Sequence, residues 1–159
     1  MIKYILLALG LWLPLPGTAQ TADSLPDPEA FFTAIIVRDI DSSIAWYTEN
    51  LGFTLIDRAE NAAIGFQQAN LKRGAVLLEL LELQAAIYPE DILAEAPPKT
   101  RIAGLFKFGF RMAEFDRWLA FLEQSGVDFL GTVVADPVSG RRMVLIKDPD
   151  GNRIQLFEP

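Results

Sequence analysis

The sequence predicts an α+β domain built from two copies of a βαβββ module. Two observations predict it. The order strand, helix and three strands occurs twice, in residues 31–83 and in residues 105–159, and the two copies align residue by residue. Residues 37–41 match residues 112–116 at a spacing of 75, and residues 78–82 match residues 154–158 at a spacing of 76. A chance repeat would rarely agree at both ends.

The first module begins with a β-branched and aromatic run, residues 31–38, which predicts a strand. Asp41 is predicted to cap a helix whose apolar residues fall at helical spacing until Gly52 ends it. Three apolar runs separated by polar or glycine-containing turns predict the remaining strands, at residues 53–57, 62–68 and 75–83.

The second module repeats this order. Residues 105–112 predict its first strand, and apolar residues from Phe115 to Leu122 predict a helix that ends before Gly126. Three further strands are predicted at residues 127–134, 142–146 and 153–157. The connector between the modules, residues 84–104, is predicted to hold a short helix at 90–96, and a plain linker is favoured there over a lid.

Residues 1–19 have the features of a secretory signal peptide. Lys3 is followed by an apolar run at 4–15, and Ala19 offers a small residue for cleavage. A membrane anchor is disfavoured because a helical span needs about 20 apolar residues. Residues 20–30 are polar and contain two prolines, which predicts an extended linker. We therefore expect a secreted or periplasmic protein that is not membrane-bound after cleavage.

Composition excludes several classes of function. The chain has 14 basic and 21 acidic residues, a net charge of −7, which becomes −8 when the leader and its one lysine are removed. This charge disfavours nucleic acid and anionic lipid as partners. The chain has no Cys and no His, so it has no disulfide, no Cys nucleophile and no Ser-His-Asp triad.

Two motifs carry a resemblance to a known family. They are V-x-D-I-D-x-S-x-x-W-Y-x-x-x-L-G-F at 37–53 and D-P-D-G-N-x-I-x-L at 148–156. Together with the repeat they resemble the vicinal-oxygen-chelate superfamily of glyoxalases, bleomycin-resistance proteins and ring-cleaving dioxygenases. The resemblance covers residues 31–159. It implies a curled eight-stranded sheet around a cavity, a divalent metal held by the first and fourth strand of each module, and a homodimer.

The four ligand positions that the resemblance implies fall on Phe32, Glu79, Lys107 and Gln155. Phe32 has no donor atom, Lys107 brings a cation where a cation would bind, and Gln155 is a weak neutral donor. The sequence therefore predicts no metal cofactor. The alternative is one divalent ion held by carboxylates and carbonyls, which suits magnesium or calcium best.

Without a metal, Lys107 is the expected partner of Glu79, since a buried carboxylate needs a neutralising group. One hypothesis is a structural ion pair in a relic cavity. Another makes Lys107 and Arg111 an anion-binding pair, with Phe32 and Gln155 shaping a small-molecule site. A third uses Glu79 as a catalytic general base.

Three function classes follow from these readings. The leading one is metal-independent binding of a small molecule, with an anionic group as one option, similar to the bleomycin-resistance branch. The alternatives are a metal-dependent lyase, isomerase or dioxygenase, and a non-catalytic scaffold domain. Two carboxylate pairs are predicted to be structural: Glu79 and Glu82 point to opposite faces of one strand, and Asp148 and Asp150 shape a turn.

Overall fold

The computed structural model describes residues 29–97, 100 and 102–159. Residues Phe31–Pro159 form one compact unit. The predicted signal peptide, and the linker up to residue 28, lie outside the described residues. Within the part that the structure describes, every helix is too short or too polar to cross a membrane.

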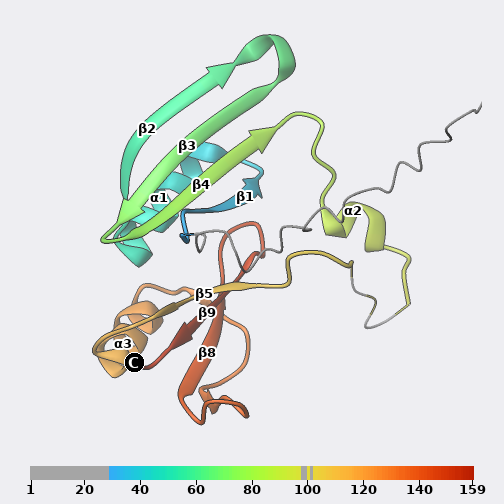
Figure 1. Cartoon of the computed structure of the whole chain (residues 1–159). Helices are drawn as coiled ribbons and strands as arrows, with labels where there is room; N and C mark the ends of the chain where they lie inside the picture. The colour runs from blue at the N-terminus through green and yellow to red at the C-terminus, as the bar shows by residue number, and fades with distance from the viewer. Residues whose placement is uncertain (1–28, 98–99, 101) are drawn as a thin grey trace, which may run out of the picture. The chain divides into compact units, whose positions relative to one another are not determined.

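Module one forms a mixed four-stranded sheet with one helix on it (Figure 1). Its strands lie in the order β1-β4-β3-β2, with β1 and β4 parallel and the other pairs antiparallel. A single turn of 3-10 helix, Ala62–Ile64, separates β2 from β3. The elements are β1 (Thr33–Val37), α1 (Ile40–Leu51), β2 (Thr54–Asn61), β3 (Phe66–Arg73) and β4 (Val76–Leu83).

The helix α1 is capped two residues earlier than the sequence suggested. Asp39, and not Asp41, is the N-cap, and its carboxylate accepts a hydrogen bond from the backbone N–H of Ser42. Asp41 lies in the first turn, where its carboxylate pairs with Arg58. Gly52 ends the helix as predicted, with φ at 63°, a left-handed conformation that glycine adopts without a steric penalty.

Module two has the same order with a broken second strand. Its sheet runs β5-β9-β8-β6, and β7 also pairs with β8. The predicted strand at 127–134 is two short pieces, and the predicted strand at 105–112 is formed only at 108–111. The connector helix α2 (Pro89–Leu93) lies near the expected position. The elements are β5 (Phe108–Arg111), α3 (Phe115–Gln124), β6 (Asp128–Phe129), β7 (Val134–Ala135), β8 (Arg142–Lys147) and β9 (Arg153–Phe157).

The internal repeat is confirmed by the pairing of the strands. In module one, β1 and β4 are parallel with Ala34 opposite Glu79. In module two, β5 and β9 are parallel with Gly109 opposite Gln155. The fold class is therefore confirmed as α+β with two βαβββ-type modules. The described residues form two separate mixed sheets with nine strands in place of the eight expected, because the second strand of module two is interrupted.

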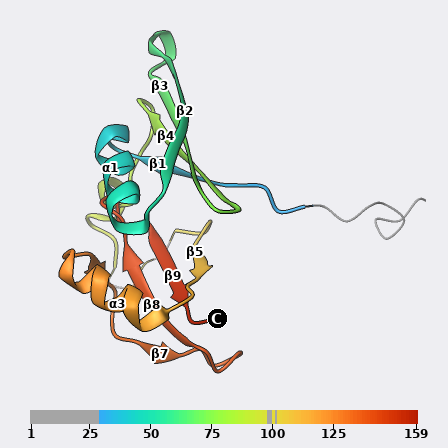
Figure 2. The same cartoon turned by 90° about the vertical axis from the view of Figure 1, so that its left-hand side faces the viewer.

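The helices α1 and α3 each cover one face of their own sheet (Figure 2). The centre of the face of module one that α1 covers is apolar: Leu78 and Leu80 of β4 and Ala69 and Leu71 of β3 are buried there. The buried apolar residues of both modules form a single hydrophobic cluster. The other face of the first sheet, which we call the open face, keeps Ala34 and Ile36 exposed.

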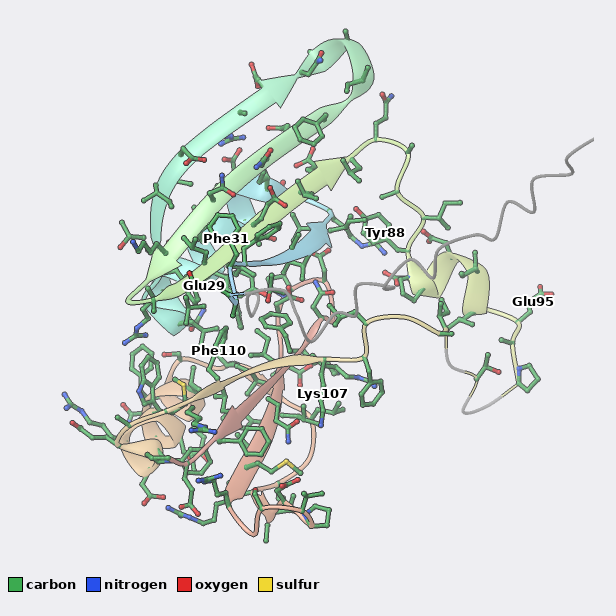
Figure 3. The ribbon with its side chains drawn as sticks, in the orientation of Figure 1. Glu29, Phe31, Tyr88, Glu95, Lys107 and Phe110 are labelled. Atoms are coloured by element: carbon green, nitrogen blue, oxygen red, sulfur yellow. The ribbon has the colours of Figure 1, made fainter. Side chains whose placement is uncertain are left out.

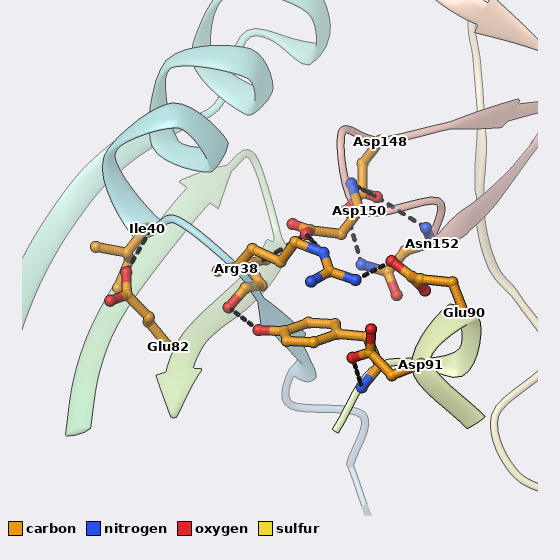
Figure 4. Close-up of polar contacts among 10 residues, drawn as sticks. Arg38, Ile40, Glu82, Glu90, Asp91, Asp148, Asp150 and Asn152 are labelled. Carbon is orange, nitrogen blue, oxygen red and sulfur yellow. Dashed lines mark hydrogen bonds and ion pairs between the residues drawn. The ribbon is translucent and has the colours of Figure 1, made fainter. Parts of the chain in front are cut away.

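The two family-like motifs contact each other. Tyr47 of α1 donates a hydrogen bond of 3.0 Å to a carboxylate oxygen of Asp148. The same carboxylate accepts hydrogen bonds from the backbone N–H groups of Asp150 and Asn152, so the predicted turn role of Asp148 is confirmed. Arg38, in the first motif, donates its backbone N–H to Asp150 (Figure 4). These contacts join module one to the last turn of module two.

Candidate functional site

The open face of module one carries a row of polar side chains across three neighbouring strands. Asp57 of β2 lies opposite Asn70 of β3, and Asn70 lies opposite Glu79 of β4. Residues paired in this way project from the same face of a sheet. Gln68, two residues before Asn70, projects from that face as well. We call Asp57, Gln68, Asn70 and Glu79 the polar row.

Hydrogen bonds link the members of the polar row. The side-chain amide of Gln68 donates to a carboxylate oxygen of Glu79 at 2.5 Å and lies 3.5 Å from the amide oxygen of Asn70. Asn70 donates to a carboxylate oxygen of Asp57 at 2.5 Å. Both carboxylates therefore accept from neutral amides. In the described part of the chain, neither carboxylate takes part in an ion pair.

A pocket of about 300 Å³ lies over the polar row. Its apolar walls are Phe31, Phe32, Ile56 and Leu77. The rings of Phe31 and Phe32 meet edge to face with their centroids 5.2 Å apart, and the two residues are 71% and 54% exposed. Figure 3 shows Phe31 against the sheet of module one. This open-face pocket thus combines two carboxylates with exposed aromatic walls.

Of the five predicted site residues, Phe32 and Glu79 share this pocket and the other three lie in module two. Lys107 is exposed on the segment that leads into β5 (Figure 3). Hydrogen bonds from Ser139 lower the pKa of Asp136, and the nearby charge of Lys107 lowers it further. Glu79 and Lys107 form no ion pair in the described structure, so the predicted pairing of these two residues is wrong.

Arg111 and Gln155 have surroundings unlike those expected. Arg111 is exposed in β5 and borders a hollow with Arg73 and Trp118. Gln155 is only 3% exposed, and its side-chain amide is directed at the sulfur of Met143. Neither residue lines the open-face pocket.

The side chains at the four family positions do not fit a metal ion. Phe32 offers no donor, Lys107 is a cation, and the amide nitrogen of Gln155 is turned toward Met143. Only Glu79 is a normal ligand. In the described part of the chain, no three Asp, Glu, Cys or His side chains gather as a metal site would require. The donor set therefore disagrees with the family's metal.

Sequence reasoning missed Asp57, Gln68 and Asn70. The third strand was expected to end at residue 68, which left Asn70 outside it and left the pairing with β2 and β4 undefined. The pattern that identifies the face is the alternation of Gln68 and Asn70 with the buried Ala69 and Leu71. The predicted separation of Glu79 and Glu82 is confirmed: Glu82 accepts from the backbone N–H of Ile40, at the start of α1.

A second polar cluster surrounds Arg38 (Figure 4). Its guanidinium lies over the ring of Tyr88, 3.7 Å from the ring centre, and forms ion pairs with Glu90 and Asp150. Tyr88 donates its hydroxyl to the backbone oxygen of Val37. The cluster fastens the α2 segment to the end of β1, and its one cation, Arg38, pairs with the carboxylates of both Glu90 and Asp150.

Comparison with known proteins identifies the fold and its relatives. A sequence model of the Glyoxalase/Bleomycin resistance protein/Dioxygenase superfamily matches residues 30–156. The uncharacterized protein YaeR of Escherichia coli is 30% identical over 126 residues, which cover 79% of this chain and 92% of YaeR. The uncharacterized protein YwkD of Bacillus subtilis is 27% identical over 126 residues with the same coverage of each chain.

Solved structures agree on the fold. A glyoxalase family protein from Enterococcus faecalis superimposes with a TM-score of 0.70 at 23% identity, over 82% of this chain and 97% of the other. The trypanothione-dependent glyoxalase I of Leishmania major gives a TM-score of 0.61 at 20% identity, over 83% of this chain and 87% of the other. At these identities the likeness concerns the fold alone.

Proposed function

Because the chain belongs to the Glyoxalase/Bleomycin resistance protein/Dioxygenase superfamily, we propose that it binds a small molecule in the open-face pocket without a metal ion. The observation that carries this proposal is the polar row beneath exposed aromatic walls. Ligand pockets combine apolar walls with a few polar groups that orient the ligand, and their volumes run from about 300 to 1,000 Å³. The open-face pocket has this composition and lies at the small end of the range.

The absence of a fitting donor set supports binding over metal chemistry. A lyase, isomerase or dioxygenase mechanism that depends on a metal has only Glu79 to hold it at the family positions. Glu79 acting as a general base would need a group that polarises a carbonyl, and Lys107, the residue expected to do so, does not pair with it. We therefore retain binding and leave the metal-dependent and general-base mechanisms as the weaker alternatives.

The proposal leaves out the anionic ligand predicted from Lys107 and Arg111. Those two cations lie in module two, whereas the charged groups that line the open-face pocket are carboxylates. A scaffold function is also disfavoured, because a domain without a ligand site would keep no open pocket, and Phe32 is exposed at one. Export to the periplasm or outside, and assembly as a homodimer, remain proposals based on residues 1–19 and on the resemblance. A mature N-terminus at Gln20, read by mass spectrometry, would support export.

Fragment screening by two-dimensional NMR tests the proposal. We expect a subset of small fragments to shift the backbone amides of Asn70 and Glu79 in a saturable way, both with and without a chelator. Leu77→Trp, which fills the pocket, should abolish these shifts. Val138→Trp, at an exposed turn of module two, should leave them unchanged. Loss of binding on addition of EDTA, or no fragment shifting these amides, would overturn the proposal.

A further inference from the structure

The charge of the open-face pocket points to the class of its ligand. Asp57 and Glu79 stand at the two ends of the polar row, in strands separated by β3, so their backbones are about 10 Å apart from the spacing of strands in a sheet. Asn70 lies between them. The pocket therefore presents two negative groups to whatever enters it.

No lysine or arginine of the described chain forms an ion pair with either carboxylate, although Lys72 of β3 lies opposite Leu77 and projects from the same open face. Arg58 follows Asp57 along β2, but its guanidinium pairs with Asp41 and bonds Gln67. Arg58 and Gln67 both belong to the face that α1 covers, since Arg58 pairs with the buried Ala69. The helix-covered face thus has its own charge partners, whereas the pocket has none.

The aromatic walls of the pocket favour a cation, as the carboxylates do. An aromatic ring carries negative charge on its face and attracts ammonium and guanidinium groups within about 6 Å. Phe31 and Phe32 are among the most exposed large apolar residues described, and both line the pocket. Aromatic walls and unneutralised carboxylates together favour a cation with an apolar body, and they disfavour an anion.

An inorganic cation fits the pocket less well than an organic one. Calcium and magnesium need about six oxygen ligands, whereas an ammonium needs only three acceptors, and the side-chain N–H groups of Gln68 and Asn70 already donate to the two carboxylates. Only two of the four polar side chains are carboxylates. An ammonium brings its own donors, which two carboxylates and the amide oxygens can accept.

We propose that the ligand of the open-face pocket is a small organic amine, carried as its ammonium ion, with an apolar or aromatic body that packs on Phe31, Phe32 and Leu77. The inference rests on the proposed function and deepens it. The ammonium binds Glu79 and Asp57, and its entry displaces the amide of Gln68 from Glu79. The pocket volume, about 300 Å³, limits the ligand to a small molecule with one ring.

Three probes of similar size that share a phenyl ring and carry a positive, a neutral or a negative polar group test this proposal. They are 2-phenylethylamine, 2-phenylethanol and phenylacetate, titrated into the whole protein and followed by calorimetry and by the NMR shifts of Asn70 and Glu79. We expect the amine to bind most tightly and phenylacetate most weakly. The affinity of the amine should fall as sodium chloride is raised, because salt screens its attraction to exposed carboxylates.

Substitutions in the polar row test whether Glu79 and Asp57 bind the amine. Glu79→Gln and Asp57→Asn should each weaken binding of the amine about tenfold, as expected for loss of one charge-assisted hydrogen bond. The alcohol should be affected little. Glu60→Gln is the matched control, because Glu60 is an exposed carboxylate of the same strand as Asp57 that lies opposite Gln67 on the helix-covered side. If a variant fails to fold, the ranking of the three probes and the salt dependence in the wild type still decide the question.

The outcomes separate this inference from the proposed function. Equal binding of the three probes, or stronger binding of phenylacetate, overturns the cationic ligand while small-molecule binding in the pocket stands. Saturable binding of calcium or magnesium at Asp57 and Glu79 that excludes the amine also overturns it, in favour of an inorganic cation. If no probe binds, the cationic ligand fails, and the proposed function fails with it only if the fragment screen is negative as well.

Discussion

Glu79 of module one and Gln155 of module two occupy equivalent places in the repeat. Each lies in the last strand of its module along the chain and opposite a small residue of the first strand. Their neighbours are equivalent as well. Asn70 lies opposite Glu79 as Leu145 lies opposite Gln155, and Gln68 lies opposite Leu81 as Met143 lies opposite Phe157. The three equivalent positions are therefore all polar in module one (Glu79, Asn70 and Gln68) and mostly apolar in module two (Gln155, Leu145 and Met143).

The surroundings of the two residues follow from these neighbours. Glu79 is half-buried at a pocket and accepts a hydrogen bond from Gln68. Gln155 is buried, with its amide directed at Met143. One backbone arrangement thus supports an open polar face in one copy and a closed face in the other. The side chains of the middle strands, and not the repeat itself, decide which copy has the pocket.

The largest expected change in stability comes from substituting the small residue of the first strand, which is Gly109 opposite Gln155 and Ala34 opposite Glu79. A Cβ atom at Gly109 would lie 2.6 Å from the backbone oxygen of Gln155, a contact that no side-chain rotation can relieve. We therefore expect Gly109→Ala to lower the free energy of unfolding by about 3 kcal/mol, the upper end of the usual cost of overpacking. Urea unfolding followed by circular dichroism measures the change.

Module one supplies the control for that substitution. Its equivalent residue is Ala34, which is exposed on the open face. Ala34→Gly should cost only about 0.5–1 kcal/mol, from the added backbone freedom of glycine. Equal costs at the two positions would contradict the claim that the second module is closed at this point.

Much of the fold followed from the sequence, because apolar periodicity and the repeat are local patterns. The first and last strands of module one and both long helices were predicted within a few residues, whereas the third strand was predicted at 62–68 and spans Phe66–Arg73. Two of the family positions, Phe32 and Glu79, line one pocket. The site was predicted less well. Asn70 was lost because the predicted strand ended too early, and a pairing register depends on the partner strand as well as on the strand itself.

The predicted pairing of Glu79 with Lys107 failed for a different reason. It assumed a first strand of module two that begins at residue 105 and faces the site of module one. Residues 105–107 are not in a strand, and Lys107 is exposed near Asp136. Contacts between distant segments depend on the whole fold, and charge complementarity in a sequence does not establish them.

An intermediate loss of stability is expected when the hydrogen bond that joins the two motifs, from Tyr47 to Asp148, is removed. The position of module two equivalent to Tyr47 is Leu122, so only module one places a hydroxyl there. Burial and the neighbouring Asp148 charge raise the pKa of Tyr47 well above its ordinary value, which keeps the phenol protonated as a donor. Tyr47→Phe removes one hydrogen bond from a buried carboxylate and should lower the free energy of unfolding by about 2 kcal/mol.

Tyr88→Phe is the matched comparison for that loss. Tyr88 donates to the neutral backbone oxygen of Val37 and is less buried, so about 1 kcal/mol or less is expected. Both variants can be followed by urea unfolding at neutral pH. A cost at Tyr88 that equals or exceeds the cost at Tyr47 would mean that the link between the two motifs contributes little to stability.

The smallest expected effect is a pH dependence of the stability that arises from Asp150, in the turn between β8 and β9. This turn is longer than the corresponding turn of module one at Gly74 and Ala75. Burial raises the pKa of Asp150 above its ordinary value, although the backbone N–H and the charge of Arg38 oppose the rise. A carboxyl with a raised pKa in the folded state favours folding at low pH, and this contribution is lost as the pH rises through the folded pKa. Asp150→Asn does not titrate, so its stability relative to the wild type should increase between about pH 3 and about pH 7.

Asp116 provides a control of opposite sign. Hydrogen bonding to Arg142 lowers the pKa of Asp116, so its contribution to stability is present above the unfolded pKa and is lost as the pH falls. Asp116→Asn should therefore lose stability relative to the wild type over the same rise in pH. Thermal unfolding of the three proteins across this range measures both slopes. If the two variants change in the same direction, burial does not control Asp150, and its contacts with Arg38 outweigh the loss of water.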